Sequence, residues 1–352
     1  MRLSEFDYRL PDASIAQEPL ADRAASRMLV VYRREARWED RWFRDLPEYL
    51  APGDCLVLND SRVFPSRLFG RRAGVHSLPV GKNNPKFRQN LSGRVEVFLL
   101  RPLSEDRKTW DALVRPGRKM RTGERVVFDS GLEAQILSRG VFGERTVRFT
   151  LDGDIYEVLG RIGHVPLPPY IHRPDCPADR ERYQTVFARE AGSVAAPTAG
   201  LHFTPQVLDA CRAAGAQLAW VTLHVGLGTF QPIHTELIEQ HRLPSECYEI
   251  PPATLAAIQS AGRVVAVGTT SVRTLESHAR TSLARGETDI FLYPGQEFRR
   301  VGAMLTNFHL PRSSLLLLVC AFAGRDLILG AYTHAVRSGY RFYSYGDCML
   351  II

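Results

Sequence analysis

The hydrophobic residues of this chain follow two different patterns. From about residue 66 to residue 151, short segments alternate apolar and polar residues and are separated by Gly, Pro and Asp turns. These segments are 94–100, 110–114, 125–128, 133–137 and 146–149. Regularly spaced short strands are typical of a small antiparallel barrel or sandwich. On both sides of this region, apolar strands alternate with helix signals, which is typical of an α/β domain.

The two patterns predict how the chain is divided. We expect a large α/β domain with an inserted small antiparallel β-barrel domain. Residues 1–62 and 155–352 would form the discontinuous α/β domain, and residues 63–154 the inserted barrel. A length of 352 residues exceeds a usual single core, so two domains also agree with the length.

The predicted barrel carries most of the positive charge. Residues 61–150 contain 19 Lys and Arg against 8 Asp and Glu, a local balance of +11, whereas the whole chain carries +7. All four lysines fall in this segment. A basic segment on a mildly acidic remainder favours a polyanionic partner, since phosphate contacts supply much of nucleic-acid affinity. A solvated basic surface that only keeps the protein soluble is the alternative.

Several classes of protein are disfavoured by the sequence. No apolar run reaches membrane-spanning length, and the N-terminus has acidic residues but no apolar core, unlike a signal peptide. The six cysteines are scattered without a C-x-x-C pair. We therefore expect free thiols in a cytoplasmic protein rather than disulfides or a zinc site. The chain also has no H-E-x-x-H motif and no G-x-G-x-x-G after a strand, which disfavours a metal hydrolase and a dinucleotide dehydrogenase.

Two loops of small residues flank a helix and a strand in the segment 182–232. The first loop, 192–200, precedes His202, and Thr204 with Pro205 predicts the start of a helix that ends near Gly215. An apolar run at 218–223 then predicts a strand that leads into the second loop, 224–230. Glycine in such loops lets the backbone approach a ligand closely. The alternative is a pair of structural turns with two hydrogen-bonded core histidines.

Polar residues follow three further predicted elements. A buried-type strand at 55–58 ends in Asn59-Asp60-Ser61-Arg62, and a strand at 263–268 leads into Thr269-Thr270-Ser271 and a helix. Strand ends and helix starts bind ligands, anions in particular. These residues are alternatively a plain turn and a helix cap. Thr306, Asn307 and His309 precede a strongly apolar helix that would hold them rigidly.

Long blocks of this sequence resemble one enzyme family. They are RYQTVFAREAGSVAAPTAGLHFT, VTLHVGLGTFQPI, GTTSVRTLES, TNFHLPRSSLLLLVCAFAG, YRFYSYGDCMLI and the N-terminal FDYRLPDASIAQEPLADRAASRMLVV and GDCLVLNDSRVFPSRLFG. Together they resemble the S-adenosylmethionine:tRNA ribosyltransferase-isomerases of queuosine biosynthesis. The resemblance implies transfer and isomerisation of the ribosyl part of S-adenosylmethionine onto the 7-aminomethyl group of a 7-deazaguanine at the wobble position of tRNA. The products would be epoxyqueuosine-tRNA, adenine and methionine.

The resemblance also implies a catalytic α/β domain with an inserted β-barrel, and residues for the site. Proton transfer and charge stabilisation would fall to His202, His224, His309, Glu190 and Asp60. The resemblance implies no metal and no separate cofactor, because S-adenosylmethionine is the consumed co-substrate. The substrate-binding set is predicted to be Asn59, Arg62, Ser193, Thr198, Gly200, Thr222, Gly226, Gly228, Thr269, Thr270, Ser271, Arg273, Asn307 and Asp347.

The implied partner is tRNA, namely the acceptors for Tyr, His, Asp and Asn. We expect the barrel to grip the anticodon stem with Arg115, Arg118, Lys119 and Arg121, while the α/β domain holds the flipped base of a monomeric enzyme. A non-catalytic tRNA-binding protein on the same scaffold is the alternative. Two departures from the family pattern bear on it: Leu243-Pro244 stands where Met-His is usual, and residues 75–92 are an insertion.

Overall fold

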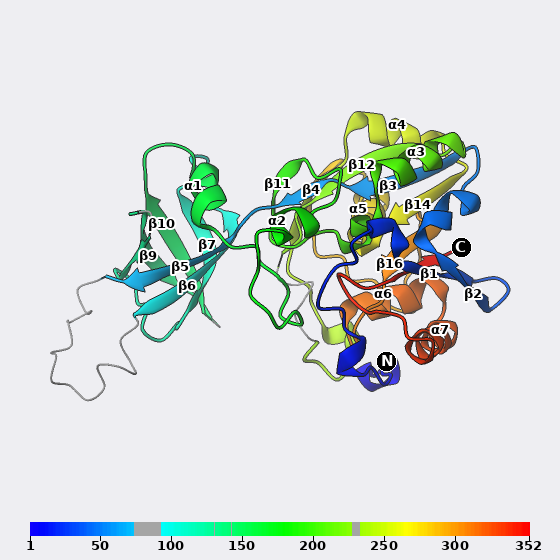
Figure 1. Cartoon of the computed structure of the whole chain (residues 1–352), viewed down its shortest axis with the longest axis horizontal. Coiled ribbons are helices and arrows are strands. Elements are labelled where there is room, and N and C mark those ends of the chain that lie inside the picture. The colour runs from blue at the N-terminus through cyan, green and yellow to red at the C-terminus, as the bar shows by residue number, and fades with distance from the viewer. Residues whose placement is uncertain (74–92, 130, 142, 227–232) are drawn as a thin grey trace. The chain divides into compact units, whose positions relative to one another are not determined.

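The structure, a computed structural model, divides into two compact units (Figure 1). It describes residues 1–73, 93–129, 131–141, 143–226 and 233–352. The larger unit comprises Met1–Arg62 and Leu167–Ile352, and the smaller unit Val63–Pro166. The predicted fold class is confirmed, because a large mixed sheet with helices and a closed antiparallel barrel are both present.

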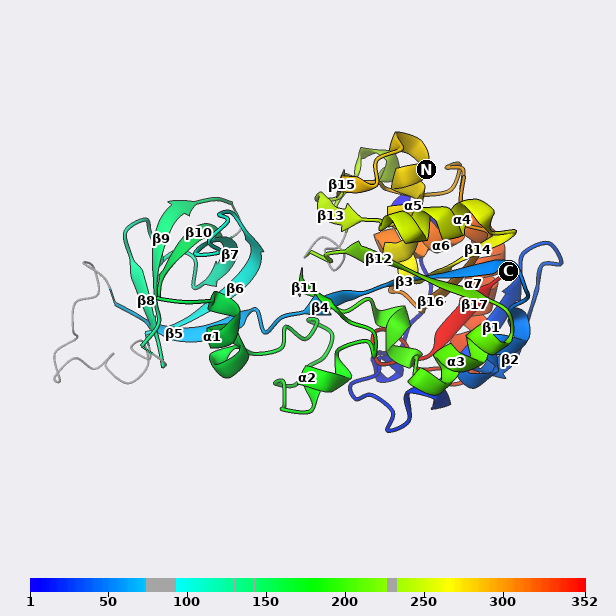
Figure 2. The same ribbon diagram turned by 90° about the horizontal axis from the view of Figure 1, so that it is seen from above.

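The larger unit is built on a nine-stranded sheet in the order β15-β13-β12-β3-β14-β16-β17-β1-β2 (Figure 2). Its four central strands, β12, β3, β14 and β16, are parallel neighbours, and their carboxyl ends therefore meet at one edge. The strands are β1 (Arg27–Tyr32), β2 (Arg37–Trp42), β3 (Asp54–Asn59), β12 (Gln217–Leu223), β13 (Glu246–Glu249), β14 (Arg263–Val267), β15 (Arg285–Thr288), β16 (Ala303–Asn307) and β17 (Cys348–Ile351).

Hydrophobic layers cover both faces of this sheet. In β3, Cys55 and Val57 point into the layer shared with α4 to α7, whereas Leu56 and Leu58 point into the layer shared with α3 and η4. The central strands are buried on both faces, which explains their unbroken apolar runs. The helices are α2 (Asp179–Arg182), α3 (Pro205–Ala213), α4 (Pro252–Ser260), α5 (Gly268–Thr281), α6 (Ser314–Ala323) and α7 (Arg325–Arg337), with short 3-10 turns that include η3 (Arg23–Ala25), η4 (Phe43–Tyr49) and η6 (Thr198–His202).

Local sequence signals explain where the helices near the site begin. Thr204 caps α3 by accepting a hydrogen bond from the Val207 N–H at 3.3 Å, with Pro205 in the first turn. Ser313 caps α6 in the same way at 3.2 Å. Among the described residues, no single helix is long and apolar enough to cross a membrane, and α6 and α7 reach that length only as a pair bent by 117°.

The smaller unit is a closed barrel of antiparallel strands in the order β10-β7-β6-β5-β8-β9. Alternate residues fill its interior, for example Val95, Val97 and Leu99 on β6, which explains the period of two. The strands are β5 (Arg67–Arg72), β6 (Arg94–Pro102), β7 (Thr109–Arg115), β8 (Arg125–Phe128), β9 (Glu133–Arg139) and β10 (Glu144–Thr150). β5 is not among the segments picked out by periodicity, because its sequence RLFGRR contains only two apolar side chains.

Helix α1 (Ile155–Ile162) belongs to the smaller unit, which therefore extends to Pro166 rather than to residue 154. Tyr156 on α1 packs edge-on against Phe64, with ring centroids 5.6 Å apart, and against Trp110 at 6.0 Å. These contacts join the helix to the barrel, although its amphipathic pattern looks like the start of the α/β region.

Candidate active site

The carboxyl edge of the central strands gathers most of the predicted site residues. β3 ends in Asn59-Asp60, β12 leads into His224, and β14 leads into Thr269-Thr270. β16 ends at Asn307. In open α/β sheets this edge is the usual place for a ligand. Two hollows lie along it, and each is lined by a different subset of the predicted residues.

The first hollow, here called the threonine hollow, is neutral. Thr198, Thr269, Thr270, Asn307 and His309 line it, together with aromatic side chains and loop backbone. The aromatic members are Tyr170, Phe308 and Tyr343. Its empty volume is about 620 Å³, part of it open to solvent. Hydroxyl and amide groups beside aromatic rings suit a nucleoside, which offers hydrogen-bonding edges and a flat base.

The second hollow, here called the acidic hollow, contains three carboxylates. Asp60, Glu190 and Glu249 line it beside His224 and two arginines, and its empty volume is about 690 Å³. Asp60 is buried and forms an ion pair with Arg189 at 2.5 Å. Glu190 and Glu249 are exposed; Glu249 pairs with Arg285 at 3.8 Å, whereas Glu190 has no ion pair within the described ranges. A cationic group entering this hollow would meet three carboxylates, two of them already paired with arginines, and an imidazole.

Asn59 and Asp60 connect the two hollows. The Asn59 side-chain amide donates to Thr270 Oγ1 of the threonine hollow at 3.1 Å. It also bridges to β12, because it donates to the Leu223 carbonyl and accepts from the Leu223 N–H, both at 3.1 Å. The next residue, Asp60, accepts from Thr222 Oγ1 at 2.7 Å in the acidic hollow. The end of β3 is thus the common wall of both hollows.

His224 leaves one ring nitrogen unused. Its Nδ1 is buried and has no hydrogen-bond partner among the described residues. Burial lowers the pKa of His224, while the charges of Glu190 and Asp60 act in the opposite direction. The ring lies against Gly192, where an added Cβ would come within 2.9 Å of it, and where φ is +149°. The glycine of the first loop therefore makes room for the imidazole of the second.

His202 is fully engaged in hydrogen bonds. Its Nδ1 lies 2.7 Å from Ser26 Oγ, and its Nε2 lies 3.1 Å from the Asn307 amide nitrogen. That amide nitrogen also donates to the Tyr343 carbonyl at 3.1 Å, so Nε2 must accept and Nδ1 must carry the proton. Burial lowers the pKa of His202 to about 3. The imidazole is neutral and orients Asn307, whose Oδ1 is buried without a partner in the described part of the chain.

His309 is equally buried, but it lines the threonine hollow. Its ring Nε2 lies 2.8 Å from Thr306 Oγ1. Its backbone N–H donates to the Tyr332 hydroxyl at 3.1 Å. Burial lowers the pKa of His309 to about 3. The three predicted histidines thus have different environments, and only His224 lies beside carboxylates.

The two low pKa values predict how stability depends on pH. Unfolded histidine titrates near 6.5, so between pH 6.5 and about 3 the unfolded chain binds protons that folded His202 and His309 exclude. Stability is therefore expected to fall as the pH decreases below 6.5, by up to about 1.4 kcal/mol per pH unit for each histidine. Urea unfolding between pH 4.5 and 7.5 measures this slope. His309→Gln should reduce it and exposed His172→Gln should not; an equal slope in His309→Gln would contradict the assignment.

Several predicted substrate-binding residues have structural partners instead. Ser193 Oγ accepts from the Val225 N–H and donates to the Ala195 carbonyl, both at 2.8 Å, and so ties the two loops together. Ser271 in the first turn of α5 donates to the carbonyl of Val267, the last residue of β14, at 2.8 Å. Asp347 accepts from two backbone N–H groups, at 2.9 and 2.8 Å. Gly200 packs against Thr185 and Phe187.

Three further predicted residues are Arg62, Gly226 and Gly228. Arg62 is exposed in β4 (Ser61–Val63), which pairs with β11 (Glu190–Ser193). Gly226 donates to Glu246 Oε1 at 2.7 Å. Gly228 lies outside the described residues, as does the insertion at 75–92.

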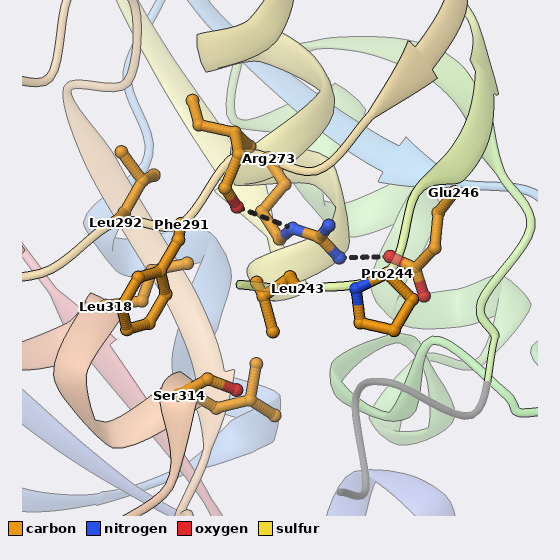
Figure 3. A pocket seen from close by; sticks show the side chains of 10 residues that line it. Leu243, Pro244, Glu246, Arg273, Phe291, Leu292, Ser314 and Leu318 are labelled. Atoms are coloured by element: carbon orange, nitrogen blue, oxygen red, sulfur yellow. Dashed lines mark hydrogen bonds and ion pairs between the residues drawn. The ribbon is translucent and has the colours of Figure 1, made fainter. Parts of the chain in front are cut away.

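Arg273 is buried and forms an ion pair with Glu246 (Figure 3). Glu246 is not among the site residues predicted from the sequence. The side chains are only 5% and 4% exposed. The Arg273 Nε also donates to the Ile290 carbonyl at 3.3 Å. Leu243 and Pro244 line the same apolar hollow with Phe291 and Leu318. The side chain at position 244 is therefore aliphatic and cannot transfer a proton. In the sequence, Glu246 was recognisable only as an acidic residue at the start of a short strand.

The four predicted tRNA-binding residues lie at the end of β7 and in the loop that follows it, here together called the basic loop. Arg115, Arg118, Lys119 and Arg121 are all exposed. Met120 between them is fully buried and anchors the loop. Buried Arg145 holds the loop from below, because it donates to the Met120 carbonyl at 2.8 Å and to the Gly117 carbonyl. The basic side chains therefore project from a fixed backbone.

Within the described residues, no group of three or more His, Cys, Asp and Glu side chains is arranged to hold a metal ion. All six cysteines are free thiols. The two hollows present hydroxyl, amide, imidazole, carboxylate and guanidinium groups.

Comparisons with known proteins cover the whole chain. A family model described as "Queuosine biosynthesis protein" matches residues 3–351. A protein from Solibacter usitatus (strain Ellin6076) named S-adenosylmethionine:tRNA ribosyltransferase-isomerase is 73% identical over 352 residues, covering 100% of both chains. One of the same name from Symbiobacterium thermophilum is 50% identical over 361 residues, with the same coverage. A crystal structure of S-adenosylmethionine tRNA ribosyltransferase from Thermotoga maritima is 38% identical, covers 99% of this chain and 100% of that one, and gives a TM-score of 0.54.

Proposed function

This chain belongs to the queuosine biosynthesis family and catalyses the S-adenosylmethionine:tRNA ribosyltransferase-isomerase reaction, and from that premise we propose where on the molecule the reaction takes place. The family resemblance of the sequence is confirmed by the family match and the full-length relatives. A non-catalytic tRNA-binding protein finds no support among them. The proposed substrates are S-adenosylmethionine, consumed without a separate cofactor, and the aminomethyl group of a 7-deazaguanine in tRNA.

The acidic hollow is the proposed place for the aminomethyl group. A primary amine is protonated at neutral pH, so it binds well among carboxylates but cannot attack carbon until it loses that proton. Asp60, Glu190 and Glu249 supply the carboxylates. The buried and unpartnered Nδ1 of His224 is the observation that carries the proposal, since it offers a neutral base within the same hollow.

The threonine hollow is the proposed place for the nucleoside of S-adenosylmethionine. The buried Oδ1 of Asn307 is available to accept a hydrogen bond from the ligand. Hydroxyl groups of Thr198 and Thr269 line the same space and would stabilise negative charge on the departing adenine. Asn59, which touches Thr270, holds this hollow beside the acidic one. The two reactants would then meet at the end of β3.

His202 and His309 are proposed to position the site rather than to exchange protons. Both remain neutral throughout the physiological pH range because burial lowers each pKa to about 3. His202 fixes the rotamer of Asn307, and His309 is tied to Thr306. A group that stays neutral still provides hydrogen bonds of fixed direction.

Nucleoside mass spectrometry tests the proposed reaction. The purified chain is incubated with S-adenosylmethionine and tRNA carrying the aminomethyl-deazaguanine, and the tRNA is then digested. Epoxyqueuosine, free adenine and free methionine are expected in equal amounts, and EDTA is expected to leave the yield unchanged. If a relative with Met-His at the corresponding positions is active under conditions where this chain yields none, the proposal fails and Pro244 becomes the first position to revert.

The basic loop of the smaller unit is the proposed tRNA contact. Replacing Arg115, Arg118, Lys119 and Arg121 with Glu is expected to weaken tRNA binding by more than about 100-fold at low salt and to lower the salt slope by about one for each lost phosphate contact. Filter binding at several salt concentrations measures both. Arg34→Glu, which changes an exposed arginine of the larger unit, is the matched control. A tRNA affinity within twofold of the unmodified protein would contradict this role.

The finer partner and cellular assignments are also proposals. We propose that the substrates are the tRNAs for Tyr, His, Asp and Asn, and that the enzyme works as a monomer in the cytoplasm. The free thiols support a reducing compartment. Light scattering of the purified protein with and without tRNA tests the monomer.

A further inference from the structure

A fourth hollow lies next to the threonine hollow in the larger unit and contains two arginines. Arg23 at the start of η3 and Arg182 at the end of α2 line it, together with Ser26, Ser344 and Tyr345. We call it the arginine hollow. Ser344 lines the threonine hollow as well. His202 lines the arginine hollow and bonds to Asn307 of the threonine hollow at 3.1 Å, so one side-chain pair separates the two.

Both arginines are held by backbone carbonyl groups. Arg23 donates to the Leu201 carbonyl at 3.0 Å and to the Glu181 carbonyl at 2.8 Å. Arg182 donates to the Ala21 carbonyl at 3.3 Å and to the Leu20 carbonyl. Neither forms an ion pair with a carboxylate in the described parts of the chain. The carbonyl groups therefore fix the orientation of each guanidinium. Because a guanidinium carries five N–H donors, each arginine keeps further N–H groups for another acceptor.

The two positive charges act on each other. Burial lowers the pKa of Arg23, and the charge of Arg182 lowers it further, whereas Glu181 acts in the opposite direction. Arg341 adds a third guanidinium near His202, because its charge, like that of Arg23, lowers the pKa of that histidine. The Nη1 of Arg341 is buried and without a hydrogen-bond partner within the described ranges.

Two nearby carboxylates are already occupied. Asp179 is paired with Arg173 at 2.7 Å and accepts from the Tyr345 hydroxyl at 2.9 Å. Asp347 accepts from the backbone N–H groups of Arg27 and Arg341. The charge of exposed Glu181 offsets that of Arg23 only in part, because burial and Arg182 act in the opposite direction. Guanidinium groups held close together favour an anionic ligand, and a planar guanidinium matches the oxygens of a phosphate or a carboxylate.

We propose that the arginine hollow binds an oxyanion of one of the two substrates while the nucleoside occupies the threonine hollow. The oxyanion is either a phosphodiester beside the modified nucleoside of the tRNA or the carboxylate of S-adenosylmethionine. This assignment rests on the proposed function, because it takes the threonine hollow to be the place of reaction. It adds a charged anchor in the larger unit to the basic loop of the smaller one.

Binding measurements with each substrate separately test the proposal and distinguish the two sources. Arg182→Gln and Arg23→Gln each remove one half-buried guanidinium of the hollow, and circular dichroism checks that each variant is folded. The matched control is Arg44→Gln, an exposed arginine whose nearest carboxylate is Asp22 at 3.4 Å. The affinity for tRNA is measured at several salt concentrations, and the affinity for S-adenosylmethionine by calorimetry.

A phosphodiester is indicated if tRNA binding weakens by about ten-fold or more and the salt slope falls by about one per arginine, with S-adenosylmethionine binding unchanged. A carboxylate is indicated if S-adenosylmethionine binding weakens by about ten-fold or more and the tRNA salt slope is unchanged. Unchanged affinity for both substrates in Arg182→Gln and in a folded Arg23→Gln overturns the proposal. Failure of the proposed function is a separate result, because it appears as absence of turnover in the unmodified protein.

Discussion

Replacing His224 with alanine is expected to lower the single-turnover rate of the reaction by about 10² to 10⁴-fold, the usual contribution of a positioned general base. The binding of S-adenosylmethionine should change little, because His224 lines the acidic hollow rather than the threonine hollow. A base must be unprotonated to act. Since burial lowers the pKa of His224 below 6.5, the rate should increase as the pH rises through that lowered pKa and should be constant at neutral pH and above.

Two control variants separate proton transfer from packing. His224→Gln fills much of the same space beside Gly192 but cannot titrate, so the low-pH limb of its rate profile should disappear. His278→Ala removes a histidine of α5 outside both hollows and should leave the rate unchanged. Rapid-quench single turnovers from pH 5 to 9 give all three profiles. If His224→Ala retains at least half of the unmodified rate at neutral pH with an intact fold, His224 is not the base.

The sequence was informative wherever a pattern is local. The change from alternating apolar and polar residues to apolar strands with helix signals predicted both the β-barrel and the α/β domain. The apolar runs of β3, β12 and β14 showed which polar residues follow at the carboxyl ends of the strands. The periodicity did not predict β2 and β5, because an edge strand or a short barrel strand can be rich in charged residues, as RWEDRW and RLFGRR are. The predicted domain boundary assigned helix α1 to the α/β domain, because the sequence of the helix alone does not show which domain it packs against.

The different fates of the three histidines could not be predicted in the same way. His202 and His224 each stand next to a glycine-rich loop, yet His202 is bonded by Ser26 and Asn307, which are distant in sequence. His224 is left with a free nitrogen because Gly192 leaves room for its ring. Burial and hydrogen bonding at such positions are set by tertiary packing. For the same reason the sequence did not show that Glu246 and Arg145 hold loops in place through hydrogen bonds to backbone groups.

Breaking the buried Arg273–Glu246 pair should give the largest loss of stability among the changes considered. Glu246→Gln removes one charge and leaves the Arg273 guanidinium buried without a counter-ion, which typically costs about 3–5 kcal/mol. Arg273→Met leaves the Glu246 carboxylate without its partner and is expected to cost a similar amount. Urea unfolding followed by circular dichroism measures both changes in the free energy of unfolding.

The double variant Glu246→Leu with Arg273→Met decides what the pair contributes. It removes both charges and is expected to recover part of the lost stability, because a hydrophobic pair often replaces a buried ion pair at little cost. Recovery should be incomplete, since the Gly226 N–H loses its acceptor and an unpaired buried donor costs about 1–3 kcal/mol. Because Gly226 follows His224 by two residues, the double variant should also lose activity even where it is folded. Single-variant losses below about 1 kcal/mol would instead mean that water reaches the pair, and Arg273 would then be open to the substrate-binding role that the sequence suggested.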